Sequence, residues 1–245
     1  MATSLSKTDR ILQALGQEYL GRRLQLGSPI SISEPKSLAI ADAFEFGQHN
    51  PDDRDTVESY RAFTAETQDQ FNLLVRSGYR FLPWMHHGQP YKNSKEMIRD
   101  VRDNRHLYVY MTRQGFGHES DGLDQSKNPL LSPSMVVKGW CNNDIFRAVH
   151  DVLGHAIGGF AFSASGELNA WRTHLEFFSP VARRAMTTET LGTNSWVMFS
   201  AAYRSEDGTL IRNSDPRWIP LEKRRYSAQK MMLMPNWVER IYVEP

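Results

Sequence analysis

The longest stretch of regular apolar spacing runs over residues 53–76, where large apolar side chains recur every three or four positions. The residues that carry it are Val57, Tyr60, Phe63, Thr67, Phe71 and Leu74, and Gly78 follows as a stop signal. Side chains at this spacing share one face of an α-helix, which needs a core to cover it. The pattern predicts a long scaffold helix, and with it a mainly helical fold.

Similar spacing predicts further helices, and two short segments have strand composition. The helices are expected over residues 7–25, 36–47, 143–157, 165–178 and 180–200, with Pro180 suited to a first turn. The strands are expected at 80–85 and 106–112, on either side of a short helix capped by Asn93 or Ser94. We therefore expect a mainly α fold of the α+β kind. It would be a single helical domain over 1–245, with residues 1–50 as an N-terminal helical arm and 51–245 as the core.

The composition is that of a globular protein in a reducing compartment. Of 245 residues, 40% are hydrophobic and 23% charged, which suits a chain with a substantial core. The net charge of +1 does not indicate a nucleic-acid partner. Cys141 is the only cysteine, so no internal disulfide can form. We see no secretory signal and no apolar run long enough to span a membrane, so a cytoplasmic protein with a small-molecule substrate is expected.

Residues 114–133 are rich in Gly, Ser, Asp, Asn and Pro and contain few large apolar side chains. A loop of this length inside a domain is often functional. Because it leads into the helix expected at 143–157, we interpret it as a lid over a site on that helix.

That helix contains His150, Asp151 and His155 within one and a half turns. Asn143 or Asp144 would cap its start, and apolar residues at helical spacing would bury one side. On an ideal α-helix, His150 and His155 would point about 140° apart. Both can face one ion only if the helix loosens between them, and Gly154 lies where this would occur. Imidazole is a common ligand of Fe, Zn, Cu and Ni, so the cluster predicts a metal site between helices.

A third ligand is needed to complete a face of the kind that binds mononuclear non-haem iron. Glu167 begins the next predicted helix, where Trp171 and His174 follow on the same face. Glu189 lies in a segment dense in threonine. A glutamate in a helix interior among threonines is less usual than one in a first turn, and both carboxylates remain candidates.

The sequence from His150 to His155 resembles the His-(Asp/Glu)-Leu-(Leu/Phe)-Gly-His iron motif of the pterin-dependent aromatic amino acid hydroxylases. This resemblance implies that His150 and His155 bind Fe(II), that a later glutamate completes the site, and that Asp151 contacts a tetrahydropterin or a ligand. Glu189 is the nearest counterpart of that glutamate, and Glu167 is the alternate. The region from Asp144 to Trp196 also looks like uncharacterised proteins encoded in phage and bacterial genomes, which implies no activity.

These observations predict an Fe(II)-dependent monooxygenase that hydroxylates a small molecule, and the resemblance implies a tetrahydropterin cofactor. Asp151 and His174 are the candidate catalytic residues. The candidate pocket residues are Trp84, His86, Trp171, Asn194 and Trp196. One alternative is a zinc-dependent hydrolase, although its familiar His-Glu-x-x-His motif spaces the histidines four apart instead of five. Another is a non-catalytic module that stacks a ligand on its tryptophans.

Overall fold

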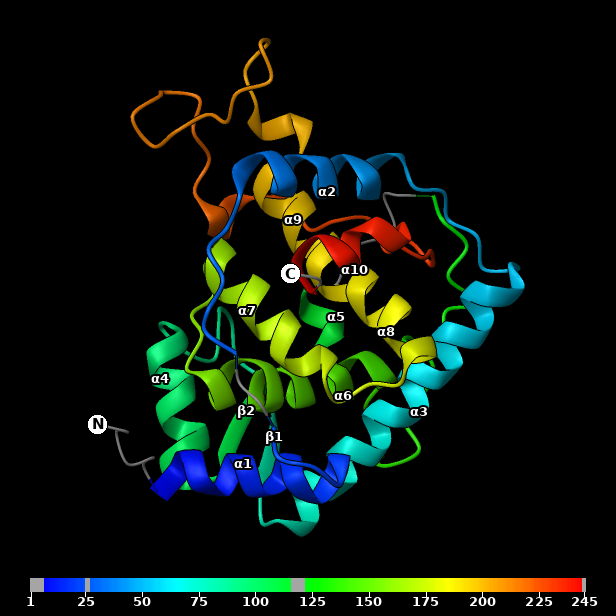
Figure 1. The fold of residues 1–245 in the computed structure, drawn as a ribbon, viewed down its shortest axis with the longest axis vertical. Coiled ribbons are helices and arrows are strands. Elements are labelled where there is room, and N and C mark those ends of the chain that lie inside the picture. The colour runs from blue at the N-terminus through cyan, green and yellow to red at the C-terminus, as the bar shows by residue number, and fades with distance from the viewer. Residues whose placement is uncertain (1–6, 25–26, 116–121, 244–245) are drawn as a thin grey trace.

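The computed structural model describes residues 7–24, 27–115 and 122–243, and most of this chain is helical (Figure 1). The α-helices are α1 (Lys7–Leu20), α2 (Glu34–Phe46), α3 (Arg54–Arg76), α4 (Ser94–Arg99), α5 (Thr112–Gly115), α6 (Asn142–Val149), α7 (Ala164–Leu175), α8 (Pro180–Thr187), α9 (Thr193–Phe199) and α10 (Asn236–Val243). The π-helical segments are η1 (Asp100–Asn104), η3 (His150–Ala156) and η4 (Thr188–Gly192), and the 3₁₀ turns are η5 (Ala201–Tyr203) and η6 (Leu221–Lys223). The expectation of a mainly helical fold with a small β element is confirmed.

The β element is a pair of parallel strands, β1 (Arg80–Trp84) and β2 (His106–Tyr110). Their register pairs Arg80 with His106 and Trp84 with Tyr110. Parallel neighbours require a crossover connection, which α4 and η1 provide. The side chain of Asn93 caps α4 by accepting a hydrogen bond from the Glu96 amide. Asn93 was one of the two residues predicted to cap this helix.

Several predicted helix ends are wrong, each for a local reason. Helix α1 ends at Leu20, because Gly21 adopts the left-handed conformation (φ +64°) that terminates helices. The N-cap of α6 is Cys141, and Asp144 in the first turn accepts a hydrogen bond from the Cys141 amide (2.9 Å). The helix expected at 165–178 ends at Leu175 as α7, and the one expected at 180–200 is divided into α8, η4 and α9.

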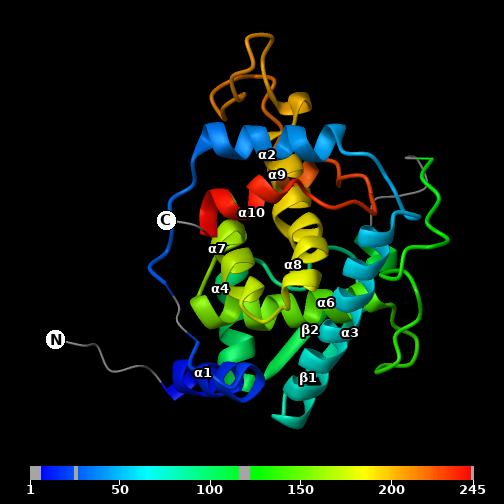
Figure 2. The same ribbon diagram turned by 45° about the vertical axis from the view of Figure 1, so that its right-hand side comes forward.

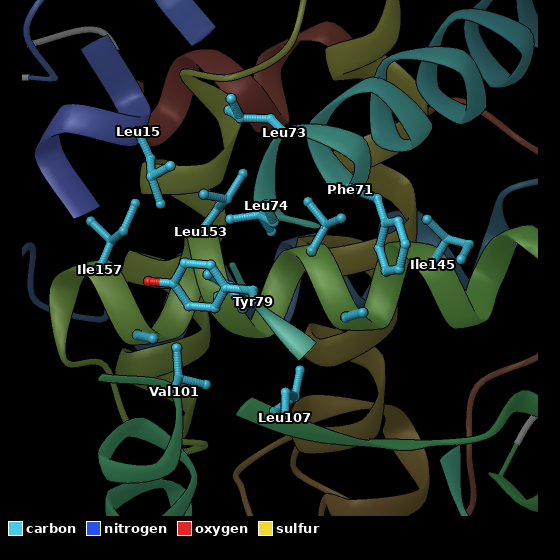
Figure 3. Packing of buried hydrophobic residues seen from close by; sticks show 14 of the residues in the cluster. Leu15, Phe71, Leu73, Leu74, Tyr79, Val101, Leu107, Ile145, Leu153 and Ile157 are labelled. Atoms are coloured by element: carbon cyan, nitrogen blue, oxygen red, sulfur yellow. The ribbon is translucent and has the colours of Figure 1, made fainter. Parts of the chain in front are cut away.

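A first apolar cluster joins α1, the C-terminal half of α3, the two strands and one side of α6 and η3 (Figure 3). Leu74 and Leu153, which are fully buried, lie near its centre. Leu15 reaches the cluster from α1, and Leu107 reaches it from β2. The cluster buries one face of the rod that α6 and η3 form.

A second cluster lies on the other side of that rod, among α2, the N-terminal half of α3, α7, α8 and α10 (Figure 2). Phe63 packs against Phe146 of α6 in an edge-on arrangement, with 4.8 Å between ring centroids. Trp171 of α7 is fully buried here. The rod of α6 and η3 therefore lies between two cores, and the side chains on its α7-facing side are shielded from water.

The predicted lid falls partly outside the described residues, which omit 116–121. Its described part is anchored. Gln125 donates a hydrogen bond to the Gln229 carbonyl (2.8 Å), and Leu130 is buried in the second cluster. These contacts give that part of the segment a fixed place against the core, which a free lid would not have. None of the helices in the described ranges is long and apolar enough to cross a lipid bilayer.

Candidate metal centre

The two histidines of the motif meet because η3 is a π-helical turn. In a π-helix, backbone hydrogen bonds join residues five apart, so side chains at i and i+5 approach one another on one face. The Ile157 amide donates to the Val152 carbonyl in this pattern. The rings of His150 and His155 lie 5.0 Å apart between centroids and are nearly perpendicular, at 87°. The loosening predicted between the two histidines is present.

Gly154 allows this turn to pack tightly. A Cβ atom added at residue 154 would lie 3.0 Å from Nδ1 of His150 and 3.2 Å from the Ala170 carbonyl oxygen of α7. Both distances are shorter than ordinary carbon contacts. Because Gly154 has no side chain, η3 can approach α7 closely, and the His150 ring can pack against the Gly154 backbone.

The orientation of His155 follows from a backbone contact. Its ring is 1% exposed, and its Nδ1 lies 3.1 Å from the Phe160 carbonyl oxygen. A carbonyl can only accept, so Nδ1 carries the hydrogen. The other ring nitrogen, Nε2, lies 3.4 Å from Oε2 of Glu167. In the neutral ring, this Nε2 is the atom with the free lone pair.

Glu167 reaches the histidines from the first turn of α7. Ser163 caps this helix by accepting a hydrogen bond from the Gly166 amide. Asn194 of α9 donates to Oε2 of Glu167 (2.8 Å), which fixes the carboxylate. Glu167 and Asn194 also line a small cavity, which Ser37, Met198 and Tyr242 complete from α2, α9 and α10.

Each of His150, His155 and Glu167 offers one ligand atom, and these three atoms lie within 4.8 Å of one another. In the part of the chain that the structure describes, His150 Nε2 is buried and has no hydrogen-bond partner. Buried polar atoms are almost always paired, so the unpartnered nitrogen of His150, in a residue grouped with two other potential ligands, fits a role in holding a metal ion. Two imidazoles and a carboxylate suit Fe(II) or Zn(II).

The charges around the cluster also favour a cation. Burial lowers the pKa of His155, but the carboxylates of Glu167 and Asp151 outweigh it and raise the pKa to about 9. Burial raises the pKa of the Asp151 carboxyl to about 6, opposed by His155. A metal ion bound to His155 Nε2 would take the place of the proton on that nitrogen. Burial lowers the pKa of His150 well below its ordinary value, so this ring is neutral, as a ligand must be.

Glu189, the glutamate that the resemblance favours, lies elsewhere. It accepts a hydrogen bond from the Tyr60 hydroxyl, and the group of potential metal ligands found among the described residues contains Glu167 in its place. The reason is that α7 folds back along η3 and brings its first turn beside His155, whereas η4 directs Glu189 toward α3. The structure therefore favours the alternate ligand.

The predicted catalytic pair is divided between two environments. Asp151 is half-buried and interacts electrostatically with His155 and Glu167, so it borders the cluster. His174 is fully buried behind His150, where its Nδ1 contacts His150 Nδ1 and its Nε2 contacts Oε1 of Gln70. Both of its nitrogens have protein partners, which leaves His174 no atom to offer a substrate.

The predicted pocket residues are also dispersed. Asn194 contacts Glu167, as described above. Trp171 is a core residue whose indole donates to Thr187 Oγ1 (3.1 Å), and Trp196 donates to Glu45 on α2. Trp84 and His86 pack edge-on against each other, with 4.8 Å between ring centroids, and the Trp84 indole donates to the Gly88 carbonyl (2.9 Å). These side chains were predicted to form one pocket wall, but tertiary packing gives them separate partners in different parts of the fold.

Two residues that contact the histidines in and behind the cluster were not identified from the sequence. Gln70 lies on the buried face of α3 and contacts His174, but its place in the apolar pattern of that helix gives no sign of this. Phe162 packs edge-on against His155, with 5.0 Å between centroids, and is 38% exposed. The run Gly158-Gly159 before it was the available sign of a tight turn. Phe162 is therefore an exposed apolar group beside the cluster.

Comparisons with protein-family models, curated proteins and solved structures find no match to this chain. The resemblance to the hydroxylases therefore rests on the six-residue motif from His150 to His155. The geometry of the cluster carries the functional interpretation.

Proposed function

We propose that this protein is a mononuclear non-haem iron enzyme that hydroxylates a small molecule, with His150, His155 and Glu167 as its metal ligands. Two observations carry the proposal: His150, His155 and Glu167 offer ligand atoms within 4.8 Å of one another, and His150 Nε2 is buried without a hydrogen-bond partner among the described residues. A facial set of two histidines and one carboxylate leaves further coordination positions open, which is typical of Fe(II) oxygenases. A bound Fe(II) ion would supply oxygen activation. The motif resemblance supports a tetrahydropterin as electron donor.

The surrounding residues have separate roles in this proposal. The Phe160 carbonyl and Asn194 orient His155 and Glu167, as partners of metal ligands commonly do. Phe162 gives the approach to His155 an apolar wall and limits access of water. Asp151 places a carboxyl at the edge of the cluster, where it can exchange a proton with a substrate or hold a cofactor.

Metal binding tests the proposal directly. Protein purified without oxygen and given Fe(II) should bind one ion per chain, measured by elemental analysis after gel filtration. His155→Ala should lose this ion, because one of three protein ligands is gone. The matched control is His87→Ala, which removes an exposed histidine outside the cluster. Wild-type protein that binds no metal under these conditions would contradict the proposal.

Zinc-dependent hydrolysis is a second candidate, favoured by Asp151 next to the ligand set. Zinc hydrolases use a carboxylate to take a proton from a metal-bound water. Tightly held zinc and activity without oxygen would support this function, whereas iron and oxygen-dependent turnover would support hydroxylation. A protein that binds an aromatic ligand but no metal would instead be a non-catalytic module.

A further inference from the structure

Behind the metal cluster, three buried side chains form a continuous line of hydrogen bonds. Gln70 Oε1 lies 2.9 Å from His174 Nε2, and His174 Nδ1 lies 3.0 Å from His150 Nδ1. Gln70 and His174 are fully buried, and His150 is 8% exposed. The line joins α3, α7 and η3, so it connects the scaffold helix to the first ligand of the cluster.

A backbone carbonyl sets the direction of every hydrogen bond in this line. Gln70 Nε2 donates to the Phe177 carbonyl oxygen (3.1 Å), which can only accept. The amide therefore turns Oε1 toward His174, and Oε1 must receive a hydrogen from Nε2 of that ring. The His174 ring is fully buried against phenyl groups, and its hydrogen-bond partners are an amide and an imidazole, with no carboxylate to compensate a positive charge. The ring is therefore neutral, and its Nδ1 is an acceptor. His150 must then donate from Nδ1, which leaves the lone pair on its Nε2.

The packing around His174 keeps this arrangement in place. Phe146 stacks on the His174 ring at 8° and 6.1 Å, and Phe178 packs at 4.9 Å from it. A fully buried ring packed against two phenyl groups cannot turn over without displacing core side chains. The one nitrogen of the two histidines that lacks a partner among the described residues is His150 Nε2, and His150 offers a ligand atom within 4.8 Å of those of Glu167 and His155.

From this geometry we infer that Gln70 and His174 are positioning residues that fix the tautomer of His150 and direct its Nε2 toward the metal. The inference rests on the proposed metal site. Outer partners of ligating histidines raise ligand basicity and hold the ring, and their loss typically weakens metal binding by about 10–100-fold. Here the outer partner is a second histidine, itself oriented by an amide on another helix.

The tautomers can be measured in the metal-free wild-type protein by ¹⁵N NMR of labelled histidines. The expected result is a hydrogen on Nδ1 of His150 and on Nε2 of His174, with His174 Nδ1 free of hydrogen. A hydrogen on His174 Nδ1 would overturn the inference. Because this measurement needs no metal, it decides on the tautomers even if the protein binds none and the proposed function fails.

Variants at Gln70 test the consequence for metal binding. Gln70→Met removes the amide at similar size and should weaken Zn(II) and Co(II) binding by about 10–100-fold. Gln68→Met makes the same change on the same helix, where Gln68 contacts Asn142, and should alter affinity by less than about twofold. Gln70→Glu keeps an acceptor for His174 and should bind at least as tightly as wild type, with a shifted Co(II) absorption spectrum.

Two results would overturn the role of Gln70. One is a folded Gln70→Met protein with wild-type affinity. The other is a Gln70→Glu protein that loses as much affinity as Gln70→Met, since the loss would then come from the Phe177 contact and not from the acceptor. If Gln70→Met does not fold, Gln70→Glu and the wild-type NMR measurement still decide.

Discussion

The imidazole rings of His150 and His155 lie 5.0 Å apart between centroids, although the two residues are five positions apart on what begins as an ordinary α-helix. The π-helical turn η3 makes this possible. Such turns are rare and are often found at functional sites. The turn is held by apolar packing on one side, through Val152 and Leu153, and by α7 on the other. The local geometry that brings the two ligands together is thus built into the core.

Gly154→Ala should reduce both stability and metal affinity. Alanine in a helix interior usually stabilises relative to glycine by about 0.5–1 kcal/mol. Here the new Cβ would lie 3.0 Å from His150 Nδ1 and 3.2 Å from the Ala170 carbonyl, so we expect a loss of about 1–3 kcal/mol instead. Urea denaturation of the metal-free protein measures this. A variant as stable as wild type would show that η3 and α7 can separate at little cost.

The local patterns predicted what local chemistry determines. The apolar spacing of α3 and the cap of α4 were predicted within one or two residues, because these features depend on neighbouring residues. The loosening at Gly154 could also be predicted, since only that geometry lets His150 and His155 face one ion. These expectations required no knowledge of which helices pack together.

The third metal ligand could not be identified from local sequence patterns. The motif resemblance favoured Glu189, but the choice depends on how α7 returns along η3, which is a tertiary contact. One available sign was that Glu167 and His174 share a face of the predicted helix, and both face η3 in the structure. Trp171, also near that face, packs into the second core instead. Helical position alone therefore predicts proximity without distinguishing a ligand from a core residue.

Glu167→Gln and Glu189→Gln should have opposite effects on metal binding. Glu167→Gln removes a charged ligand and should weaken Fe(II) or Zn(II) binding by more than about 100-fold. Loss of a residue that only contacts a ligand weakens binding by about 10–100-fold. Glu189→Gln should leave affinity nearly unchanged, because Glu189 contacts Tyr60 and not the cluster. Isothermal titration with Zn(II) compares the two. Loss of binding in Glu189→Gln alone would return the ligand role to Glu189.

Glu189→Gln should also change how stability depends on pH. Burial raises the pKa of Glu189 from 4.5 to about 7, although the hydrogen bond from Tyr60 opposes this shift. A carboxyl with a raised pKa in the folded state favours folding at low pH, and this contribution is lost as pH rises from 4.5 to about 7. The glutamine variant does not ionise. It should therefore gain stability relative to wild type over that range, by up to about 3 kcal/mol at pH 8.

Denaturation of both metal-free proteins at pH 5 and pH 8 checks this expectation. The informative quantity is the change with pH in the difference between their free energies of unfolding, since the other titrating groups are common to both. A difference that is the same at the two pH values would mean that Glu189 is ionised throughout and that its surroundings are more polar than its burial indicates.

Asn194→Leu should weaken metal binding while the protein stays folded. Asn194 Nδ2 donates to Glu167 Oε2 at 2.8 Å, so the amide holds the carboxylate in the direction of His155. Leucine is similar in size but cannot donate, and the freed carboxylate would lose part of its orientation. We expect Zn(II) affinity to fall by about 10–100-fold. Asn194→Asp should fall less than Asn194→Leu, because it also lacks the donor but adds a negative charge that attracts the cation. Equal affinities for wild type and Asn194→Leu would mean that α7 alone holds Glu167 in place.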